Sequence, residues 1–221
     1  MRILVHGHKG KMRSLSCKAI SEDSHLELVG QSDENDSLSK KIEKERPQVV
    51  LDFTSSANVI NNIKTIISYE VHPVVSTNRF SHQQINLLTK LCRIKKLGCL
   101  IVPNFSIAHN LMVRYCKNIN KYFKNSMLIN ICDERAVEKK LVQANKTIEC
   151  LDFDQHYPNN IDSECLPTFT YHKKVVFSST SEIFTIKVSS ISRNSFIPGI
   201  CFSCKIVGSL NGLVYGLDNL L

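Results

Sequence analysis

The sequence lacks any long apolar stretch. Hydrophobic residues make up 43% of its 221 positions, yet no segment approaches the roughly 18 uninterrupted apolar residues of a membrane span. The first apolar run, Ile3 to Val5 with Met1 nearby, leads straight into a polar loop and is too short for a signal peptide. The length suffices for one large domain or two small ones with real cores. We therefore expect a globular cytoplasmic protein without a membrane partner.

A disulfide framework and a metal motif are also missing. The nine cysteines are odd in number and spread along the chain, which in a cytosolic protein is typical of free, mostly buried thiols. Cys201 and Cys204 have CxxC spacing, but no second CxxC or flanking histidine pair accompanies them. Positions three apart share one face of a helix. We interpret this pair as core residues and expect no bound metal.

Concentrated positive charge is absent as well. The net charge is +8, but the lysines are dispersed and no aromatic-rich basic stretch occurs. Surfaces that bind nucleic acid gather lysine and arginine on one face or along one helix. We therefore expect these lysines to be solvated and expect no nucleic-acid partner.

The first half of the sequence alternates short apolar runs with helical patterns. Strands are expected at residues 2–6, 25–30, 48–54, 72–78 and 99–106. Helices are expected at residues 12–20, 37–45, 56–70 and 81–98. Ser81 is expected to cap the last of these helices. Such alternation predicts a doubly wound parallel sheet, a Rossmann-like α/β fold.

The pattern changes after Ser106. A long amphipathic helix is expected at 107–123, a half-buried strand at 127–134 and strands within 175–192, before a final helix entered through Pro198 and Gly199. These elements predict a second domain of the α+β class.

The loop "VHGHKGKMRS" follows the first expected strand. Gly7 permits a tight turn and Gly10 permits close backbone approach, where the N–H groups of a helix start would meet an anion. Lys9 and Lys11 add positive charge. The full dinucleotide fingerprint is G-x-G-x-x-G, whereas this loop has G-x-x-G, and Arg13 stands where a further glycine could serve helix packing.

Asp33 strengthens this interpretation. It follows the second expected strand and lies about 20 residues beyond the loop, where an acid commonly accepts the ribose hydroxyls of NAD. The alternative is an ordinary turn aspartate in the segment "SDEND". Loop and acid together favour a cofactor-binding fold.

Six segments resemble the dihydrodipicolinate reductase (4-hydroxy-tetrahydrodipicolinate reductase) family. They occur in the family's order and span the chain. The most specific are "VPNFSIAHN", similar to P-N-F-S-x-G-x-N, and "ISRNSFIPGI", similar to S-R-x-x-F-x-x-G-A. The others are "GHKGKM", "VVLDFTSSANVINN", "VVSTNRFS" and "GLVYGLDNLL".

The resemblance implies a fold and a reaction. A dinucleotide-binding domain at 1–106 would precede an α+β substrate and oligomerisation domain with a mixed sheet at 107–198, and a C-terminal helix at 199–221 would return to the first domain. The reaction implied is hydride transfer from NADH or NADPH to a cyclic dicarboxylate, hydroxy-tetrahydrodipicolinate, in lysine and diaminopimelate biosynthesis. A cytoplasmic homotetramer is the implied assembly.

The resemblance also implies the cofactor contacts. At the pyrophosphate they are Gly7, His8, Lys9, Gly10, Lys11 and Met12. At the ribose the contact is Asp33. Near the nicotinamide they are Ser76, Thr77, Asn78, Pro103, Asn104 and Phe105.

The chain departs from the family beyond residue 132. The family's catalytic segment reads E-x-H-H-x-x-K-x-D-x-P-S-G-T, and in register with it Lys139 falls on the lysine, the general acid. Arg135 and Ala136 replace the two histidines, and Q-A-N-K replaces P-S-G-T. Arg135, Asn145 and Lys146 are therefore the candidate substrate contacts. Without this register, Lys139 in its Glu-Lys-Lys run reads as a solvated surface lysine.

Three functions stay open at this point. The chain is a working reductase, a catalytically degenerate relative that still binds dinucleotide, or another NAD(P)-dependent oxidoreductase on the same scaffold. The choice between NADH and NADPH is open too, because Asp33 favours a free ribose hydroxyl whereas Lys9 and Lys11 would favour a 2′-phosphate.

Overall fold

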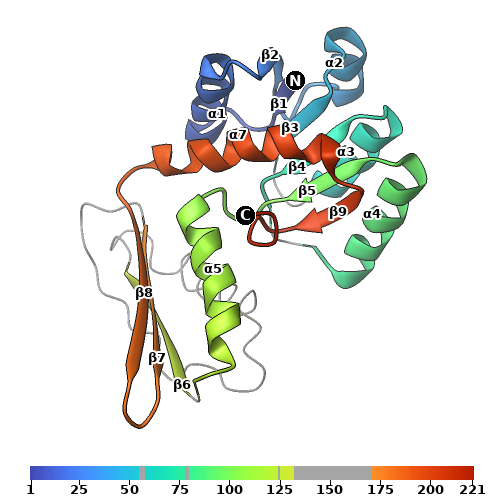
Figure 1. Cartoon of the computed structure of the whole chain (residues 1–221). Coiled ribbons are helices and arrows are strands. Elements are labelled where there is room, and N and C mark those ends of the chain that lie inside the picture. The colour runs from blue at the N-terminus through green and yellow to red at the C-terminus, as the bar shows by residue number, and fades with distance from the viewer. Residues whose placement is uncertain (55–57, 78–79, 124, 132–170) are drawn as a thin grey trace. The chain divides into compact units, whose positions relative to one another are not determined.

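The chain folds into two compact units. A computed structural model describes residues 1–54, 58–77, 80–123, 125–131 and 171–221. The first unit comprises residues 1–105 and 196–217, and the second comprises residues 106–195 and 218–221 (Figure 1). None of the described helices is long and apolar enough to cross a bilayer.

The first unit is built on a six-stranded sheet with the order β2-β1-β3-β4-β5-β9. All of its strand pairs are parallel. The strands are β1 (Arg2–His6), β2 (Glu27–Ser32), β3 (Val49–Asp52), β4 (His72–Val75), β5 (Gly98–Ile101) and β9 (Gly212–Tyr215). The first five confirm the strands expected from the apolar runs. The sixth, β9, lies within residues 199–221, where a C-terminal helix was expected; the helix there ends at Ile206. The strand was missed because its four residues follow a turn and its side chains are only partly buried.

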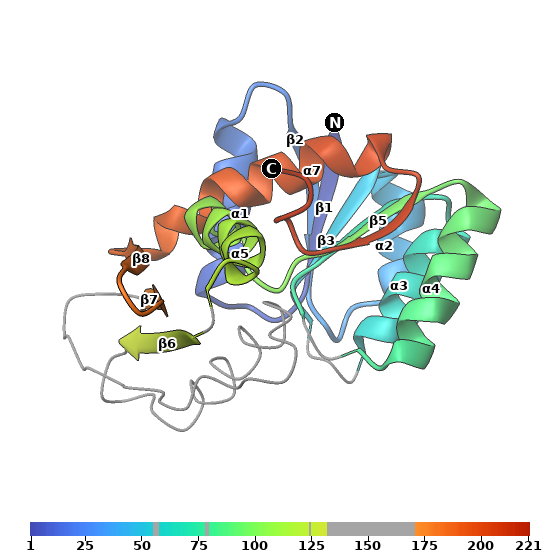
Figure 2. The same cartoon turned by 60° about the horizontal axis from the view of Figure 1, so that its bottom comes forward.

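Helices cover both faces of this sheet (Figures 1 and 2). One face carries α2 (Leu38–Glu45), α3 (Val59–Ser68) and α4 (His82–Lys95). The other face carries α1 (Lys11–Glu22) and α7 (Ile197–Ile206), which contact each other. The central strands are buried from both sides, which explains their continuous apolar runs. Ser81 caps α4 in a capping box with Gln84, as expected.

The packing of α7 depends on one glycine. A Cβ atom at Gly199 would lie 1.8 Å from the carbonyl oxygen of Phe105, so the helix backbone rests directly on the segment after β5. Cys201 and Cys204 are both buried in this helix. Their pKa values are raised by burial, which fits the interpretation of the CxxC pair as core residues.

The second unit packs one helix on a small antiparallel sheet. The helix is α5 (Ile107–Asn120), and the sheet has the order β6-β7-β8. The strands are β6 (Asn125–Ile131), β7 (Tyr171–Ser178) and β8 (Ile183–Ser190). A mixed sheet was expected, whereas the described strands pair only antiparallel. Lys117 of α5 binds Asp218 at 2.9 Å and so fastens the C-terminal residues to this unit.

We expect Gly199→Ala to destabilise the protein by about 1–3 kcal/mol, because overpacking forces backbone shifts. Gly208→Ala is the matched control, since its Cβ would meet the flexible Cε of Met1 at 2.8 Å and Nε2 of His72 at an ordinary 3.9 Å, and both atoms belong to side chains. We expect the control to stay within about 0.5 kcal/mol of the parent. Urea unfolding followed by circular dichroism measures both. Equal stability of the Gly199 variant and the parent would contradict the close packing of α7.

Candidate functional site

The expected site residues of the first unit lie where its parallel strands end. In open α/β sheets, ligands bind outside the carboxyl ends of the strands, where the strand order reverses. Here the chain passes from β1 to β2 on one side and then to β3 on the other. The loop at Gly7 follows β1, and Asp33 follows β2.

Gly7 forms the tight turn expected of it. Its φ angle is +128°, and a Cβ atom there would lie 2.8 Å from the carbonyl carbon of Phe53. Its N–H donates a hydrogen bond to the carbonyl oxygen of Ser32, at 3.1 Å. Only glycine tolerates both this angle and this approach. The turn therefore joins the ends of β1, β2 and β3.

Gly10 serves a different purpose. It is the N-cap of α1, with extended φ and ψ angles, and no side chain of the described residues caps that helix. The nearest atom to a Cβ at Gly10 would be the carbonyl oxygen of His8, at 3.8 Å. Among the described residues beyond its chain neighbours, no other atom comes within 4 Å of that position, so a methyl group there would enter open space. An anionic pyrophosphate fits a helix start of this kind.

Arg13 is built into the loop. Its side chain is only 10% exposed, and it forms an ion pair with Asp33, with Nη1 3.5 Å from Oδ2. Nη1 also donates to the carbonyl oxygen of Gly7, at 3.0 Å, and Nη2 donates to Oε1 of Gln31, at 3.5 Å. The arginine that departs from the glycine fingerprint therefore links the loop to β2. Sequence reasoning missed this role, because spacing alone does not show where a side chain turns.

A buried polar network fixes the ends of the first three strands. His6 shares a 2.7 Å hydrogen bond with Ser32 through Nδ1. Asp52 accepts from the Thr54 N–H at 2.7 Å and from Nδ2 of Asn62 at 3.0 Å. Burial lowers the pKa of His6, although the nearby Asp52 carboxylate opposes this effect. Asp52 and Asn62 lie in a segment that resembles the family, but no pattern pointed to their hydrogen bonds.

The residues after β4 and β5 approach the same edge. Ser76 donates its N–H to the carbonyl oxygen of Asp52, at 2.9 Å. The Phe105 ring lies 6.1 Å from the Phe53 ring. The side chains of Thr77 and Pro103 are partly exposed there. Asn104, which forms contacts of its own, is also partly exposed.

Several expected site residues lie outside the described part of the chain. They are Asn78, Arg135, Lys139, Asn145 and Lys146. The expected cofactor residues other than Asn78 belong to the described part of the first unit, and the substrate residues stay predictions. Within the described ranges, no group of three or more His, Cys, Asp or Glu side chains is arranged to hold a metal ion.

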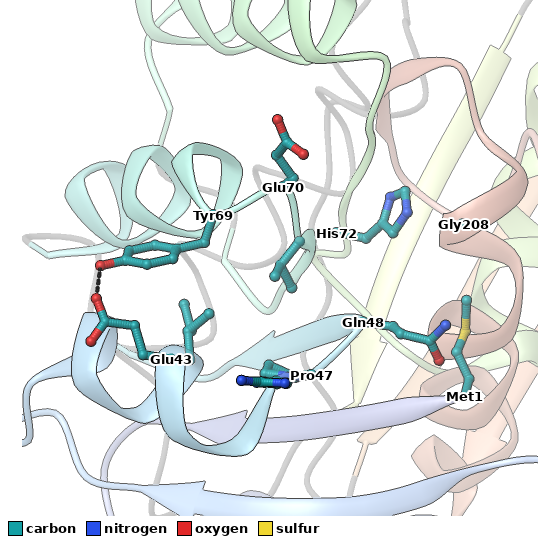
Figure 3. A pocket seen from close by; sticks show the side chains of 11 residues that line it. Met1, Glu43, Pro47, Gln48, Tyr69, Glu70, His72 and Gly208 are labelled. Atoms are coloured by element: carbon teal, nitrogen blue, oxygen red, sulfur yellow. Dashed lines mark hydrogen bonds between the residues drawn. The ribbon is translucent and has the colours of Figure 1, made fainter.

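A separate hollow lies at the opposite edge of the sheet (Figure 3). It is lined by residues that precede β1, β3 and β4, among them Met1, Gln48 and Val71. Across it, the Tyr69 hydroxyl donates to Oε1 of Glu43 at 2.6 Å. None of the expected site residues lines this hollow, so it is distinct from the candidate site.

The parallel doubly wound sheet, the Gly7 turn at the start of α1 and the acid after β2 define a dinucleotide-binding α/β protein of the oxidoreductase type. A family model described as "Dihydrodipicolinate reductase, N-terminus" matches residues 1–105. Over its full length the chain is similar to the 4-hydroxy-tetrahydrodipicolinate reductase of Coxiella burnetii (strain RSA 493 / Nine Mile phase I), with 33% identity covering 99% of that relative. The chain belongs to the 4-hydroxy-tetrahydrodipicolinate reductase family.

Other comparisons agree with this assignment. The reductase of Legionella pneumophila (strain Paris) is 32% identical over 100% of this chain and 99% of its own. The solved structure "Dipicolinate bound Dihydrodipicolinate reductase from Paenisporosarcina sp. TG-14" has a TM-score of 0.88 and 25% identity, and the match covers 100% of this chain and 99% of that one. GenD2 in complex with NAD shares only 9% identity, with a TM-score of 0.66 over 93% of this chain and 86% of that one, and so shows the fold alone.

We expect the stability of the protein to fall as the pH drops below the ordinary histidine value of about 6.5. The unfolded chain then binds a proton at position 6 that the folded chain resists, because burial lowers the pKa of His6. His6 lowers the free energy of unfolding by at most about 1.4 kcal/mol for each unit by which the pH falls. Urea unfolding at pH 7.5 and 5.5 measures the loss for the parent and for His6→Asn.

The decrease in the free energy of unfolding between pH 7.5 and pH 5.5 should be smaller in His6→Asn than in the parent, whatever that variant's absolute stability. His82→Asn is the control, because His82 is exposed. A loss in His6→Asn as large as in the parent would show that His6 is not the group responsible.

Proposed function

We propose that this chain catalyses the NAD(P)H-dependent reduction of 4-hydroxy-tetrahydrodipicolinate to tetrahydrodipicolinate, in lysine and diaminopimelate biosynthesis. The observation that carries this proposal is the full-length similarity to reductases of that name, at 33% identity. The Gly7 turn and the open start of α1 support it, because both features suit a dinucleotide. No specific observation favours a different oxidoreductase.

The first unit holds the cofactor in this proposal. The loop from Gly7 to Met12 binds the pyrophosphate through backbone N–H groups, with Lys9 and Lys11 adding positive charge. Asp33 accepts hydrogen bonds from the adenine ribose. The bound dinucleotide supplies the hydride. The remaining cofactor contacts, near the nicotinamide, are Ser76, Thr77, Asn78, Pro103, Asn104 and Phe105.

The segment beyond residue 132 holds the substrate. The reduction adds a hydride and a proton to the substrate, and the 4-hydroxyl group leaves as water. Lys139 donates the proton, and Arg135 binds one substrate carboxylate through its planar fork of N–H donors. Asn145 and Lys146 contact the other carboxylate. These roles rest on the family register, in which Lys139 falls on the family's lysine.

We also propose a cytoplasmic homo-oligomer, a tetramer by resemblance to the family. A reducing compartment is supported by the free, buried thiols Cys17, Cys92, Cys99, Cys116, Cys201 and Cys204. Assembly through the second unit is supported by its exposed apolar side chains, since such side chains mark contact surfaces. Ile183 is 76% exposed and Phe184 is 43% exposed.

We expect the purified protein to oxidise NADH or NADPH when hydroxy-tetrahydrodipicolinate is freshly generated. Lys139→Ala should lower kcat by about 10²–10⁴-fold, which is the usual contribution of a positioned proton donor. Lys140→Ala is the adjacent control and should keep kcat within a few-fold of the parent. Turnover unaffected by Lys139→Ala would refute the acid assignment. Dinucleotide binding without any turnover would instead identify a degenerate relative.

The two loop glycines should respond differently to alanine. Gly10→Ala should raise the dissociation constant for NADH about tenfold or more, because its methyl group would occupy the open space before α1. Its stability should change by less than about 1 kcal/mol. Gly7→Ala should destabilise the fold itself, because of its positive φ and the contact with Phe53. Nicotinamide fluorescence and thermal unfolding measure the two effects. Unchanged NADH binding by a stable Gly10→Ala would refute the pyrophosphate site.

A further inference from the structure

The ion pair between Arg13 and Asp33 joins the first turn of α1 to the end of β2. The guanidinium Nη1 lies 3.5 Å from Oδ2 of the carboxylate. The Arg13 side chain is 10% exposed and the Asp33 side chain is 23% exposed. The carboxylate is thus accessible to an incoming group, while the cation behind it is largely enclosed.

Both partners are held in place by further hydrogen bonds. Arg13 donates to the carbonyl oxygen of Gly7 and to the side-chain oxygen of Gln31. The Asp33 N–H donates to Oδ2 of Asp36 at 2.8 Å, and its carbonyl oxygen accepts from the Asp36 N–H at 3.0 Å. The positive charge therefore stays beside the carboxylate.

Apart from Asp52, which is buried, the other charged side chains considered at this edge are more exposed than Arg13. His8 lies 3.4 Å from Glu34, but its side chain is 74% exposed and that of Glu34 is 29% exposed. Lys9 and Lys11 are exposed as well. Salt and water screen exposed charges more strongly than enclosed ones. The potential at Asp33 is therefore governed by Arg13 more than by the loop lysines.

We propose that Arg13 allows one ribose site to accept both NADH and NADPH, by neutralising Asp33. The inference rests on the proposed function, in which Asp33 faces the adenine ribose. The two dinucleotides differ at the 2′ position of that ribose, which carries a hydroxyl group in NADH and a phosphate group in NADPH. An unpaired carboxylate accepts the hydroxyl and repels the phosphate. A carboxylate paired with an enclosed guanidinium still accepts the hydroxyl but repels the phosphate far less.

The test measures the binding of each dinucleotide in the absence of substrate, with nicotinamide fluorescence as the signal. The quantity compared is the ratio of the NADPH dissociation constant to the NADH dissociation constant. Arg13→Gln should raise this ratio about tenfold, because it exposes the phosphate to an unbalanced carboxylate. Asp33→Asn should lower the ratio by a similar factor. The double variant should return to within about threefold of the parent, because its pair is again neutral.

Three further variants separate charge from structure. Arg13→Lys keeps the charge and should keep the ratio. Lys18→Gln removes an equal charge from the same helix at a 74% exposed side chain and should leave the ratio unchanged. Lys11→Gln should weaken both dinucleotides alike, because the pyrophosphate is common to them. A purely structural loss at Arg13 would lower the thermal midpoint and would not move the ratio.

The outcomes distinguish a failure of this inference from a failure of the proposed function on which it rests. If Arg13→Gln does not fold, Arg13→Gly provides a second neutral variant. A ratio that moves less than about threefold in the folded neutral variant overturns the role of Arg13, while binding of both dinucleotides by the parent keeps the proposed function. If the parent binds neither NADH nor NADPH, the inference and the proposed function are both overturned.

Discussion

The close approach of two backbones, at Gly7 and at Phe53, is the constraint on which the candidate site depends. A single methyl group at Gly7 would lie 2.8 Å from the Phe53 carbonyl carbon. Because β1 and β3 are adjacent in the sheet, this contact sets where the loop leaves β1 and therefore where α1 begins. The N–H groups at the start of α1 are fixed by the same contact. The position of the candidate binding site at the start of α1 therefore depends on the close packing of Gly7 against Phe53.

The same reasoning gives physical meaning to segments that sequence comparison treats as separate motifs. Phe53 of the "DFT" segment lies beside Phe105 of the "PNFS" segment. Phe105 in turn supports α7 at Gly199, which belongs to the "SRNSFIPG" segment. Residues nearly 200 positions apart therefore form one chain of contacts, from the Gly7 turn to the helix near the end of the sequence. A change in one segment would disturb the next, whereas the surface of the unit has no such restriction.

Much of the fold could be predicted from the sequence, and the exceptions have physical reasons. Fully buried strands such as β3 and β5 can be predicted because they are continuous apolar runs in the sequence. Strand β9 has only four residues at the sheet edge, next to a final helix, so its pattern is weak. In the site, backbone geometry was predictable because glycine spacing encodes it. The network of His6, Asp52 and Asn62 was not, because hydrogen bonds between distant side chains leave no periodic signal.

Arg13 shows how a departure from a motif can be reinterpreted by its contacts. In the sequence, Arg13 stands where a further glycine could serve helix packing, which suggests a degenerate site. In the structure its guanidinium binds the Gly7 carbonyl and the Asp33 carboxylate, both of which belong to the site. A long side chain can therefore occupy the first turn of α1 without filling the space before Gly10, because it turns toward β2. In the proposed function, Arg13 changes the charge at the ribose and leaves the start of α1 open for the pyrophosphate, so its consequence should be acceptance of both dinucleotides and not loss of binding.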